Sequence, residues 1–287
     1  MDTLVANKKK TCVQSRIRKA LLGAPILSQR LQAGRAILRF GPWRHAVRAI
    51  ICRWKPPRDG SVSDTVVPLQ LNLPQLTQAL RLDGIAMARE LPPDLLNSIR
   101  AITDTLPPGE YGDFHVLPAV RELVRSSDVL GVVRGYLRAE PELLECNVVV
   151  ARLEGAVTPK IGSQRLFHFD YAGWHSLNLF IYLTDVEEGS GAHQVVAGTH
   201  RSRKMWDAIR PSIPDEEITA RYPGRVRTIT GRAGTMFFED TSALHRRQVV
   251  SRRRVLLNVL YASHRSWLSK GRLIRKYSDY LLSAGSP

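Results

Sequence analysis

The spacing of apolar and polar residues changes near residue 146. Before this point, apolar residues recur every three or four positions over residues 73–82, 92–103 and 118–137, which predicts three helices. After it, short β-rich runs predict strands over residues 147–153, 166–171, 177–183, 194–196, 225–229, 235–238 and 254–261, with a helical insert at 202–220. Helices followed by many short strands predict a mainly β protein with helical buttresses and a jelly-roll, or double-stranded β-helix, core.

A stretch rich in helix-breaking residues, 56–63, divides the chain into a helical extension over residues 1–58 and a larger domain over 59–287. Within the extension, apolar residues fall at helical spacing on one side, with Arg44 and Arg48 off it: Trp43, Val47, Ile50, Ile51 and Trp54. The extension holds 14 Lys or Arg against one acid, a net charge of +13, whereas the other 229 residues hold 28 against 25, a net charge of +3.

The basic extension fits several roles. A basic amphipathic helix can bind an anionic membrane surface, or it can pack on the larger domain with its arginines in solvent. Nucleic-acid binding is a weaker interpretation because no reader motif accompanies the charge, and an arginine-rich, acid-poor start is also typical of a mitochondrial presequence. The sequence holds no apolar run long enough to span a bilayer, no secretory signal and three widely spaced cysteines, so we expect a cytoplasmic protein, peripheral on a membrane if the extension binds one.

A candidate metal site begins with His168 and Asp170. Two residues apart on a strand, these side chains point to the same face, so an imidazole and a carboxylate converge. A second histidine brought in by a neighbouring strand would complete the two-histidine, one-carboxylate set that leaves three positions open on iron(II). His245 is the candidate, because it follows a glycine turn and an apolar strand, residues 231–240.

A candidate anion site follows His245. Alternation over residues 254–261 places Arg254 on one face with Leu256, Asn258 and Leu260, so its guanidinium can enter the cavity that His245 borders. A buried arginine needs an anion, and its planar fork suits a carboxylate such as the distal one of 2-oxoglutarate. Arg252, on the same face, is the second choice.

Together these residues resemble the phytanoyl-CoA dioxygenase family of iron(II)- and 2-oxoglutarate-dependent oxygenases, over about residues 80–264. The run from His168 to His175, with Trp174 four residues after the carboxylate, is also similar to the ectoine hydroxylase branch. Two features depart from the family pattern: Arg246 and Arg247 follow His245, and the gap from His245 to Arg254 is short. The motifs that carry the resemblance are residues 82–85, His168-Phe169-Asp170, residues 182–186, Ser190-Gly191-Ala192-His193, Gly198-Thr199-His200-Arg201, residues 231–235, His245 and Arg254.

The resemblance implies hydroxylation of an unactivated C–H bond with Fe(2+), 2-oxoglutarate and O2. It implies structural roles for His193 and His200. Further pocket candidates are Gln164 for the cosubstrate, and Trp174, Asn178 and Tyr182 for the substrate. Arginines near the expected mouth, at 246, 247, 252 and 253, favour an anionic substrate such as a phosphorylated lipid, a glycolipid or a CoA ester. A jelly-roll binding module without turnover, or a membrane-surface protein, is the alternative, and the sequence does not determine the oligomeric state.

Overall fold

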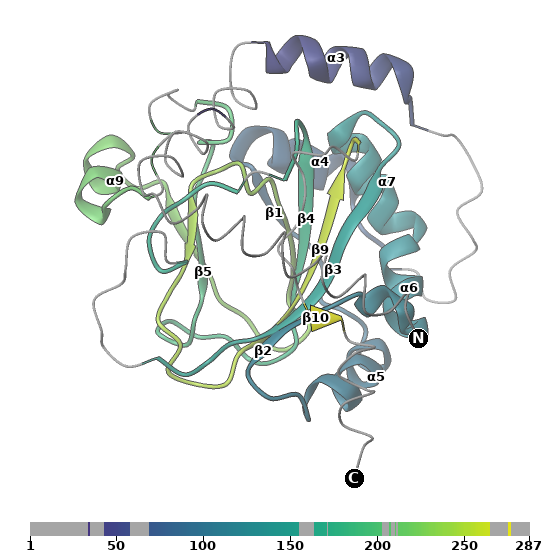
Figure 1. The fold of residues 1–287 in the computed structure, drawn as a ribbon, viewed down its shortest axis with the longest axis vertical. Helices are drawn as coiled ribbons and strands as arrows, with labels where there is room; N and C mark the ends of the chain where they lie inside the picture. The colour runs from purple at the N-terminus through teal and green to yellow at the C-terminus, as the bar shows by residue number, and fades with distance from the viewer. Residues whose placement is uncertain are drawn as a thin grey trace, which may run out of the picture.

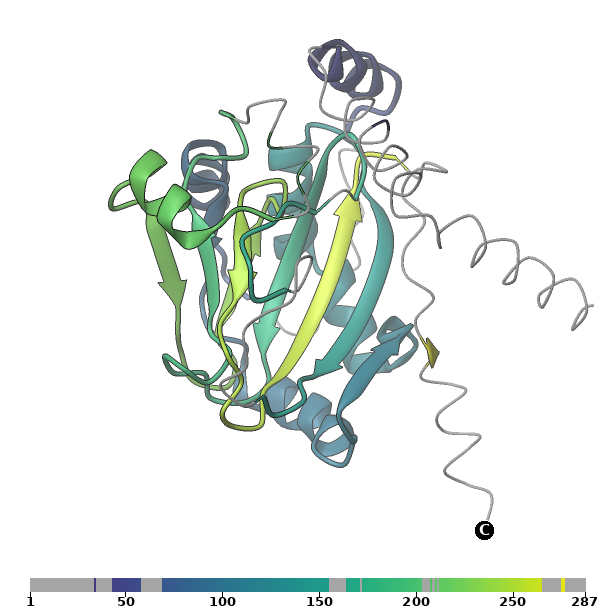
Figure 2. The same cartoon turned by 60° about the vertical axis from the view of Figure 1, so that its left-hand side comes forward.

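The computed structural model describes residues 34, 43–57, 69–154, 164–170, 172–202, 207, 210, 212–264 and 275–276. Two β-sheets face each other, and helices cover the outer face of the larger sheet (Figures 1 and 2). This arrangement confirms the predicted jelly-roll core with helical buttresses. Of residues 265–287, the structure describes two, which form β10 (Arg275–Lys276).

The larger sheet has seven strands in the order β1-β7-β4-β9-β3-β2-β10. Its pairs are antiparallel, except that β10 runs parallel to β2. The other strands, in chain order, are β1 (Ile85–Met87), β2 (Gly109–Gly112), β3 (Glu142–Val150), β4 (Ser176–Tyr182), β7 (Met236–Glu239) and β9 (Val255–Ala262). The smaller sheet has the order β6-β5-β8, made of β5 (His193–Val196), β6 (Val226–Ile229) and β8 (His245–Arg247).

Four helices of the domain and a short 3-10 turn precede the strand-rich half, and a fifth helix interrupts it. They are α4 (Leu73–Asp83), α5 (Pro93–Thr103), η1 (Phe114–Val116), α6 (Pro118–Arg125), α7 (Ser127–Leu137) and α9 (Asp215–Arg221). The predicted helix over residues 118–137 is two helices, because Ser126 leaves the helical conformation and its Oγ accepts the Val129 N–H at 3.3 Å to start α7. Gly84, at φ +79°, ends α4 and turns the chain into β1.

Strand β9 shows how the sheet separates its two faces. Val255, Leu257, Val259 and Tyr261 belong to the core shared with the helices, whereas Leu256 packs with the apolar residues between the two sheets. This alternation confirms the predicted face and places Arg254, Leu256, Asn258 and Leu260 toward the interior of the jelly roll.

The prediction of a strand over residues 166–171 was wrong. This segment makes isolated bridges, Phe167 with Ile213 and His168 with His245, and no continuous strand. Four short strands among the described residues, β1, β2, β8 and β10, were not predicted, because two to four residues are too few for a period to be read.

Helix α3 (Arg44–Trp54), the described part of the basic extension, contacts the larger domain (Figure 1). Arg44 and Arg48 donate to backbone carbonyls of the domain, and the Lys55 carbonyl accepts the Glu140 N–H at 3.0 Å. None of the described helices is both long enough and apolar enough to cross a membrane.

Candidate metal centre

Two imidazoles and one carboxylate converge between the two sheets. The ligand atoms of His168, Asp170 and His245 all lie within 4.8 Å of one another. Asp170 Oδ1 is 3.9 Å from His168 Nε2, and Asp170 Oδ2 is 3.5 Å from His245 Nε2. A metal about 2.1 Å from each atom would hold them roughly 3 Å apart, so small side-chain movements complete the site. The donor set fits a divalent transition metal with three positions left open.

Backbone pairing brings the ligands together across a long stretch of sequence. His168 and His245 exchange two N–H to carbonyl hydrogen bonds, each 3.0 Å long, and the Asp170 N–H donates to the Thr241 carbonyl at 2.9 Å. Each histidine Nδ1 lies against a carbonyl of its own segment, at Leu166 (2.8 Å) and at Ala243 (3.0 Å). A ring that donates from Nδ1 presents Nε2 to a metal, so the local backbone sets the orientation of both ligands.

The site has one dry side and one open side. The side chains of His168 and His245 are 19% and 7% exposed, whereas that of Asp170 is 46% exposed. Burial and the neighbouring His245 lower the pKa of His168 to about 4. Burial also opposes charge on His245, but Asp170 and Glu239 outweigh it and raise its pKa to about 9. A metal bound at His245 Nε2 would therefore take the place of a proton.

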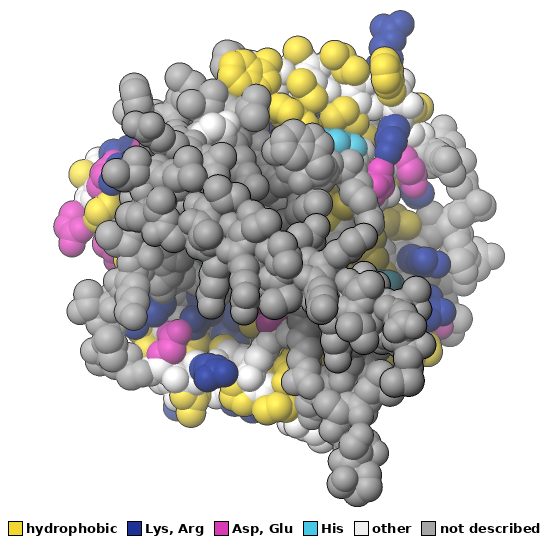
Figure 3. Space-filling model, in the orientation of Figure 1, with side chains coloured by type: hydrophobic (Ala, Val, Ile, Leu, Met, Phe, Trp, Pro, Cys, Tyr) yellow, Lys and Arg dark blue, Asp and Glu magenta, His cyan; other side chains and the backbone are white. Residues whose placement is uncertain are grey.

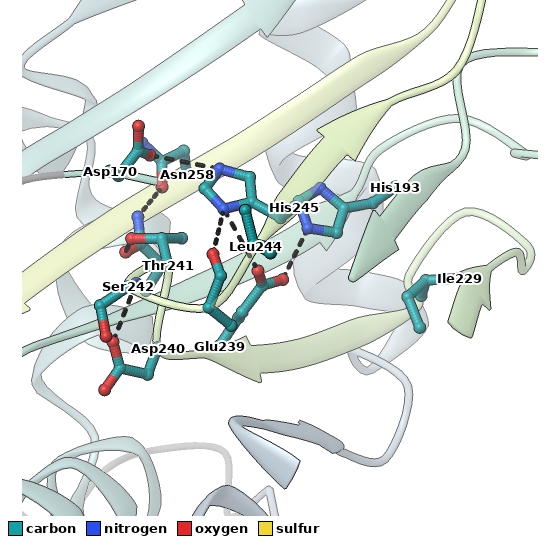
Figure 4. A network of polar contacts seen from close by, with 12 residues as sticks. Asp170, His193, Ile229, Glu239, Asp240, Thr241, Ser242, Leu244, His245 and Asn258 are labelled. Carbon is teal, nitrogen blue, oxygen red and sulfur yellow. Dashed lines mark hydrogen bonds and ion pairs between the residues drawn. The ribbon is translucent and has the colours of Figure 1, made fainter. Parts of the chain in front are cut away.

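A buried carboxylate stands behind the ligands, and sequence reasoning missed it. Glu239, fully buried at the end of β7, lies between two histidine rings, with Oε2 2.6 Å from His193 Nε2 and Oε1 3.9 Å from His245 Nδ1 (Figure 4). A carboxylate behind a ligating histidine fixes its ring and increases its basicity. The available signal was a charged residue two positions after Phe237, on the inward face of an apolar strand.

Arg254 lies at the inner end of the same interior. It is 2% exposed, its guanidinium stands 5.4 Å from the ring centre of Tyr182, and its Nε has no hydrogen-bond partner among the described residues. Burial lowers the pKa of Arg254, although the neighbouring Tyr182 raises it. Gly191 makes room for it, since a Cβ there would be 2.7 Å from Arg254 Cδ. A buried guanidinium with an unmet donor fits an anionic ligand.

The two arginines considered for 2-oxoglutarate binding, Arg254 and Arg252, lie in different environments. Arg252 is on the surface, with its side chain 73% exposed and its NH1 3.1 Å from Glu187 Oε2. Gln164 is also exposed, and its carbonyl accepts the Arg247 N–H at 2.8 Å. The Arg252 guanidinium is thus engaged on the surface, away from the interior that holds Arg254.

Two of the three predicted substrate-pocket residues lie on the inner face of β4. Asn178 donates from Nδ2 to Asn258 Oδ1 at 2.8 Å, and its Oδ1 accepts the Thr241 hydroxyl at 3.1 Å. Tyr182 is fully buried, and its hydroxyl donates to the Ile229 carbonyl at 2.9 Å. Asn178 therefore forms a polar floor beside the metal ligands, whereas Tyr182 packs beneath Arg254.

Trp174, the third predicted substrate-pocket residue, is half-buried. Its carbonyl accepts a hydrogen bond from Arg48 Nε of α3 at 2.7 Å. Helix α3 thus touches the chain four residues after Asp170. The described part of the extension is part of the surroundings of the metal site.

The arginines expected to attract an anionic substrate are engaged elsewhere. Arg246 pairs with Asp215 at 2.7 Å, and Arg247 holds Glu154 through two hydrogen bonds of 2.7 and 3.2 Å. Arg253 donates to three carbonyls at the end of α5 and beyond it. With Arg252 on Glu187, these four side chains give no support to an anionic substrate.

A second buried cluster lies between the metal site and α3. Tyr136 donates to Asp240 Oδ2 at 2.6 Å, and its ring lies 5.0 Å from that of His175. Burial would raise the pKa of Asp240, but the charges of His200, Arg48 and His175 outweigh it and hold the pKa well below its usual range. Burial is also the main cause that lowers the pKa of His175, to about 3, with Arg48 contributing.

Known proteins are similar to this chain in sequence over part of its length and in fold. No family model matches the sequence. The chain is similar to an ectoine dioxygenase of Bordetella parapertussis (strain 12822), with 27% identity over 157 residues, which is 46% of this chain and 49% of that protein. The match thus spans about half the length of this curated relative.

Among solved structures, EctD from S. alaskensis with bound Fe aligns with a TM-score of 0.50 and 16% identity, over 77% of this chain and 93% of that chain. The two proteins share a fold. At this level of identity, the likeness establishes the jelly-roll architecture, and the chemistry of this chain must be argued from its own residues.

Proposed function

We propose that this chain is an iron(II)- and 2-oxoglutarate-dependent dioxygenase that hydroxylates an unactivated C–H bond. The convergence of His168, Asp170 and His245 carries the proposal, because two imidazoles and one carboxylate are the facial set that leaves iron(II) three open positions. The sequence similarity to an ectoine dioxygenase and the fold shared with an iron-bound protein support it. When bound, iron(II) and 2-oxoglutarate would supply the oxidation, using O2 and releasing succinate and carbon dioxide.

The residues of the chain have distinct tasks in this proposal. His168, Asp170 and His245 hold the metal, and Glu239 places a buried negative charge 3.9 Å from His245 Nδ1. Arg254 binds the distal carboxylate of 2-oxoglutarate and so fixes its orientation, while Tyr182 supports the guanidinium from below. The exposed side of Asp170 is where the substrate would approach. The buried rings on the other side exclude water.

The test is an anaerobic titration of iron(II) and then 2-oxoglutarate, followed by the visible charge-transfer band of the chelate. We expect a band in the wild type, none in His168→Ala, and a requirement for at least roughly tenfold more 2-oxoglutarate in Arg254→Ala. Arg252→Ala is the matched control, because its guanidinium lies on the surface. Absence of the band in folded wild-type protein would overturn the proposal.

A binding module without turnover would keep the metal set and lose the reaction. A chelate band together with no succinate formation, with or without candidate substrates, would favour this second candidate. The substrate itself we propose to be a small molecule or a lipid. A series of anionic and neutral substrates would determine whether the substrate is charged, since the arginines at 246, 247, 252 and 253 are engaged elsewhere.

A further inference from the structure

Helix α3 turns two of its arginines, Arg44 and Arg48, toward the protein. Arg44 is 6% exposed and donates from NH2 to the His200 carbonyl at 3.3 Å, and Arg48 donates to the Trp174 carbonyl at 2.7 Å. On the same side, the Cys52 thiol lies 3.5 Å from the Leu137 carbonyl. Arg44 and Arg48, which the sequence placed off its apolar side, therefore anchor α3 to the domain.

The outward side of α3 is apolar instead. Ile50 is 52% exposed and Trp54 is 81% exposed, and Ala46 and Ala49, which precede them, are exposed too. Trp43, at the start of the helix, is 41% exposed. Figure 3 shows apolar side chains gathered over α3 at the top of the molecule. A surface helix normally buries its whole apolar stripe, but here only Val47 and Ile51 are half-buried, whereas Ile50 and Trp54 face outward. These exposed apolar side chains point to a function outside the domain.

We propose that this outward face of α3, centred on Ile50 and Trp54, binds an anionic lipid bilayer. Exposed tryptophan and aliphatic side chains beside Arg53 and Lys55 are suited to the boundary between headgroups and acyl chains. Residues 43–57 contain no acidic residue, and residues 1–58 carry a net charge of +13, with 14 Lys or Arg against one acid. Each cation near an anionic membrane adds to the attraction.

Other occupants fit the charge and the orientation less well. A second copy of the chain would bring two strongly basic segments together, and like charges repel. A nucleic acid would be bound through outward arginines, but Arg44 and Arg48 point inward and donate to the domain. An anionic bilayer can bury the apolar side chains of this face and attract the basic residues around it.

The test is flotation of the full chain with two kinds of vesicle, phosphatidylcholine alone and phosphatidylcholine mixed with phosphatidylglycerol. We expect binding to the mixed vesicles and at least about tenfold weaker binding by the double variant Ile50→Ser, Trp54→Ser. The matched control is Met87→Ser, Leu153→Ser, which removes side chains that are 48% and 67% exposed elsewhere in the domain and should bind like the wild type.

Two results would overturn the proposal: wild-type protein that does not float with the mixed vesicles, or a double variant that floats equally well. A concentration-dependent dimer in light scattering that the double variant loses would assign this face to a second copy instead. The metal site is a separate matter, because Ile50 and Trp54 are outside it. The double variant should keep its unfolding transition and the chelate band, whichever way the vesicle experiment turns out.

Discussion

Arg48 Nε donates to the carbonyl oxygen of Trp174 at 2.7 Å, across 126 positions of sequence. The donor belongs to α3, and the acceptor lies four residues after the ligand Asp170. The basic extension is therefore hydrogen-bonded directly to the segment that follows the ligand Asp170. The same arginine contributes to the field that holds the Asp240 pKa down.

Removing this hydrogen bond should loosen α3. A hydrogen bond from a charged donor contributes about 1.5 to 3 kcal/mol, so we expect Arg48→Ala to speed amide exchange in α3 by roughly tenfold or more. Hydrogen exchange read by mass spectrometry measures this. Arg53→Ala, on the exposed side of the same helix, is the control and should leave the exchange near the wild-type rate. Equal exchange in the two variants would mean that α3 is held by other contacts.

Gly191→Ala should weaken cosubstrate binding without removing the metal. An added Cβ would lie 2.7 Å from Arg254 Cδ and 2.9 Å from Val250 Cγ2, so the guanidinium must shift. We expect at least about tenfold weaker 2-oxoglutarate binding and unchanged iron(II) affinity, both from the anaerobic titration.

Gly189→Ala controls for backbone strain, since Gly189 has φ +75° and an added Cβ there meets nothing within 4 Å. A similar loss of 2-oxoglutarate binding in both alanine variants would attribute the effect to strain in the turn, and not to Arg254.

Glu239→Gln should weaken metal binding although Glu239 is not a ligand. The substitution keeps the shape and removes the charge that faces His193 at 2.6 Å and His245 at 3.9 Å. Loss of such a supporting carboxylate typically costs about 10- to 100-fold in metal affinity, measurable by competition with a chelator. Glu154→Gln, which removes the partner of Arg247 instead, should keep the wild-type affinity. If both variants bind iron(II) equally well, Glu239 has only a packing role.

Acid should destabilise the fold through His175. Burial holds its pKa at about 3, whereas a histidine in the unfolded chain titrates near 6.5. Between these pH values the unfolded state binds a proton at His175 that the folded state does not. The contribution of the neutral, buried His175 to the free energy of unfolding is therefore complete above about pH 6.5 and is lost as the pH falls toward 3. The loss is on the order of 4 kcal/mol in the free energy of unfolding.

Urea unfolding of wild type and His175→Gln at several pH values measures this contribution. The variant should be less sensitive to acid over this range, because glutamine does not titrate. Parallel curves for the two proteins would show that His175 does not contribute. Unfolding at neutral pH serves as the check that the variant is folded.

The sequence by itself determined the jelly-roll architecture and the inner face of β9. Alternation with period two requires only that one face be buried, and residues 254–261 carry that pattern in their own order. The metal-site prediction could also be made from the sequence. His168 and Asp170 are two residues apart, and few residue types bind iron(II), so His245 could be chosen although it is distant in the sequence.

Tertiary structure alone decided which arginine enters the interior and which way α3 faces. Arg254 and Arg252 have the same parity. Arg254 adjoins the start of β9 and its carbonyl still accepts the Ala151 N–H at 2.9 Å, whereas Arg252 lies in the preceding loop and reaches Glu187 on the surface. Helical period separates the two sides of α3 without saying which is inward. The carbonyls of Trp174 and His200 accept hydrogen bonds from Arg48 and Arg44, so the side of α3 that carries these arginines faces the domain. Such choices depend on partners 65 to 156 residues away in the sequence, which no local pattern encodes.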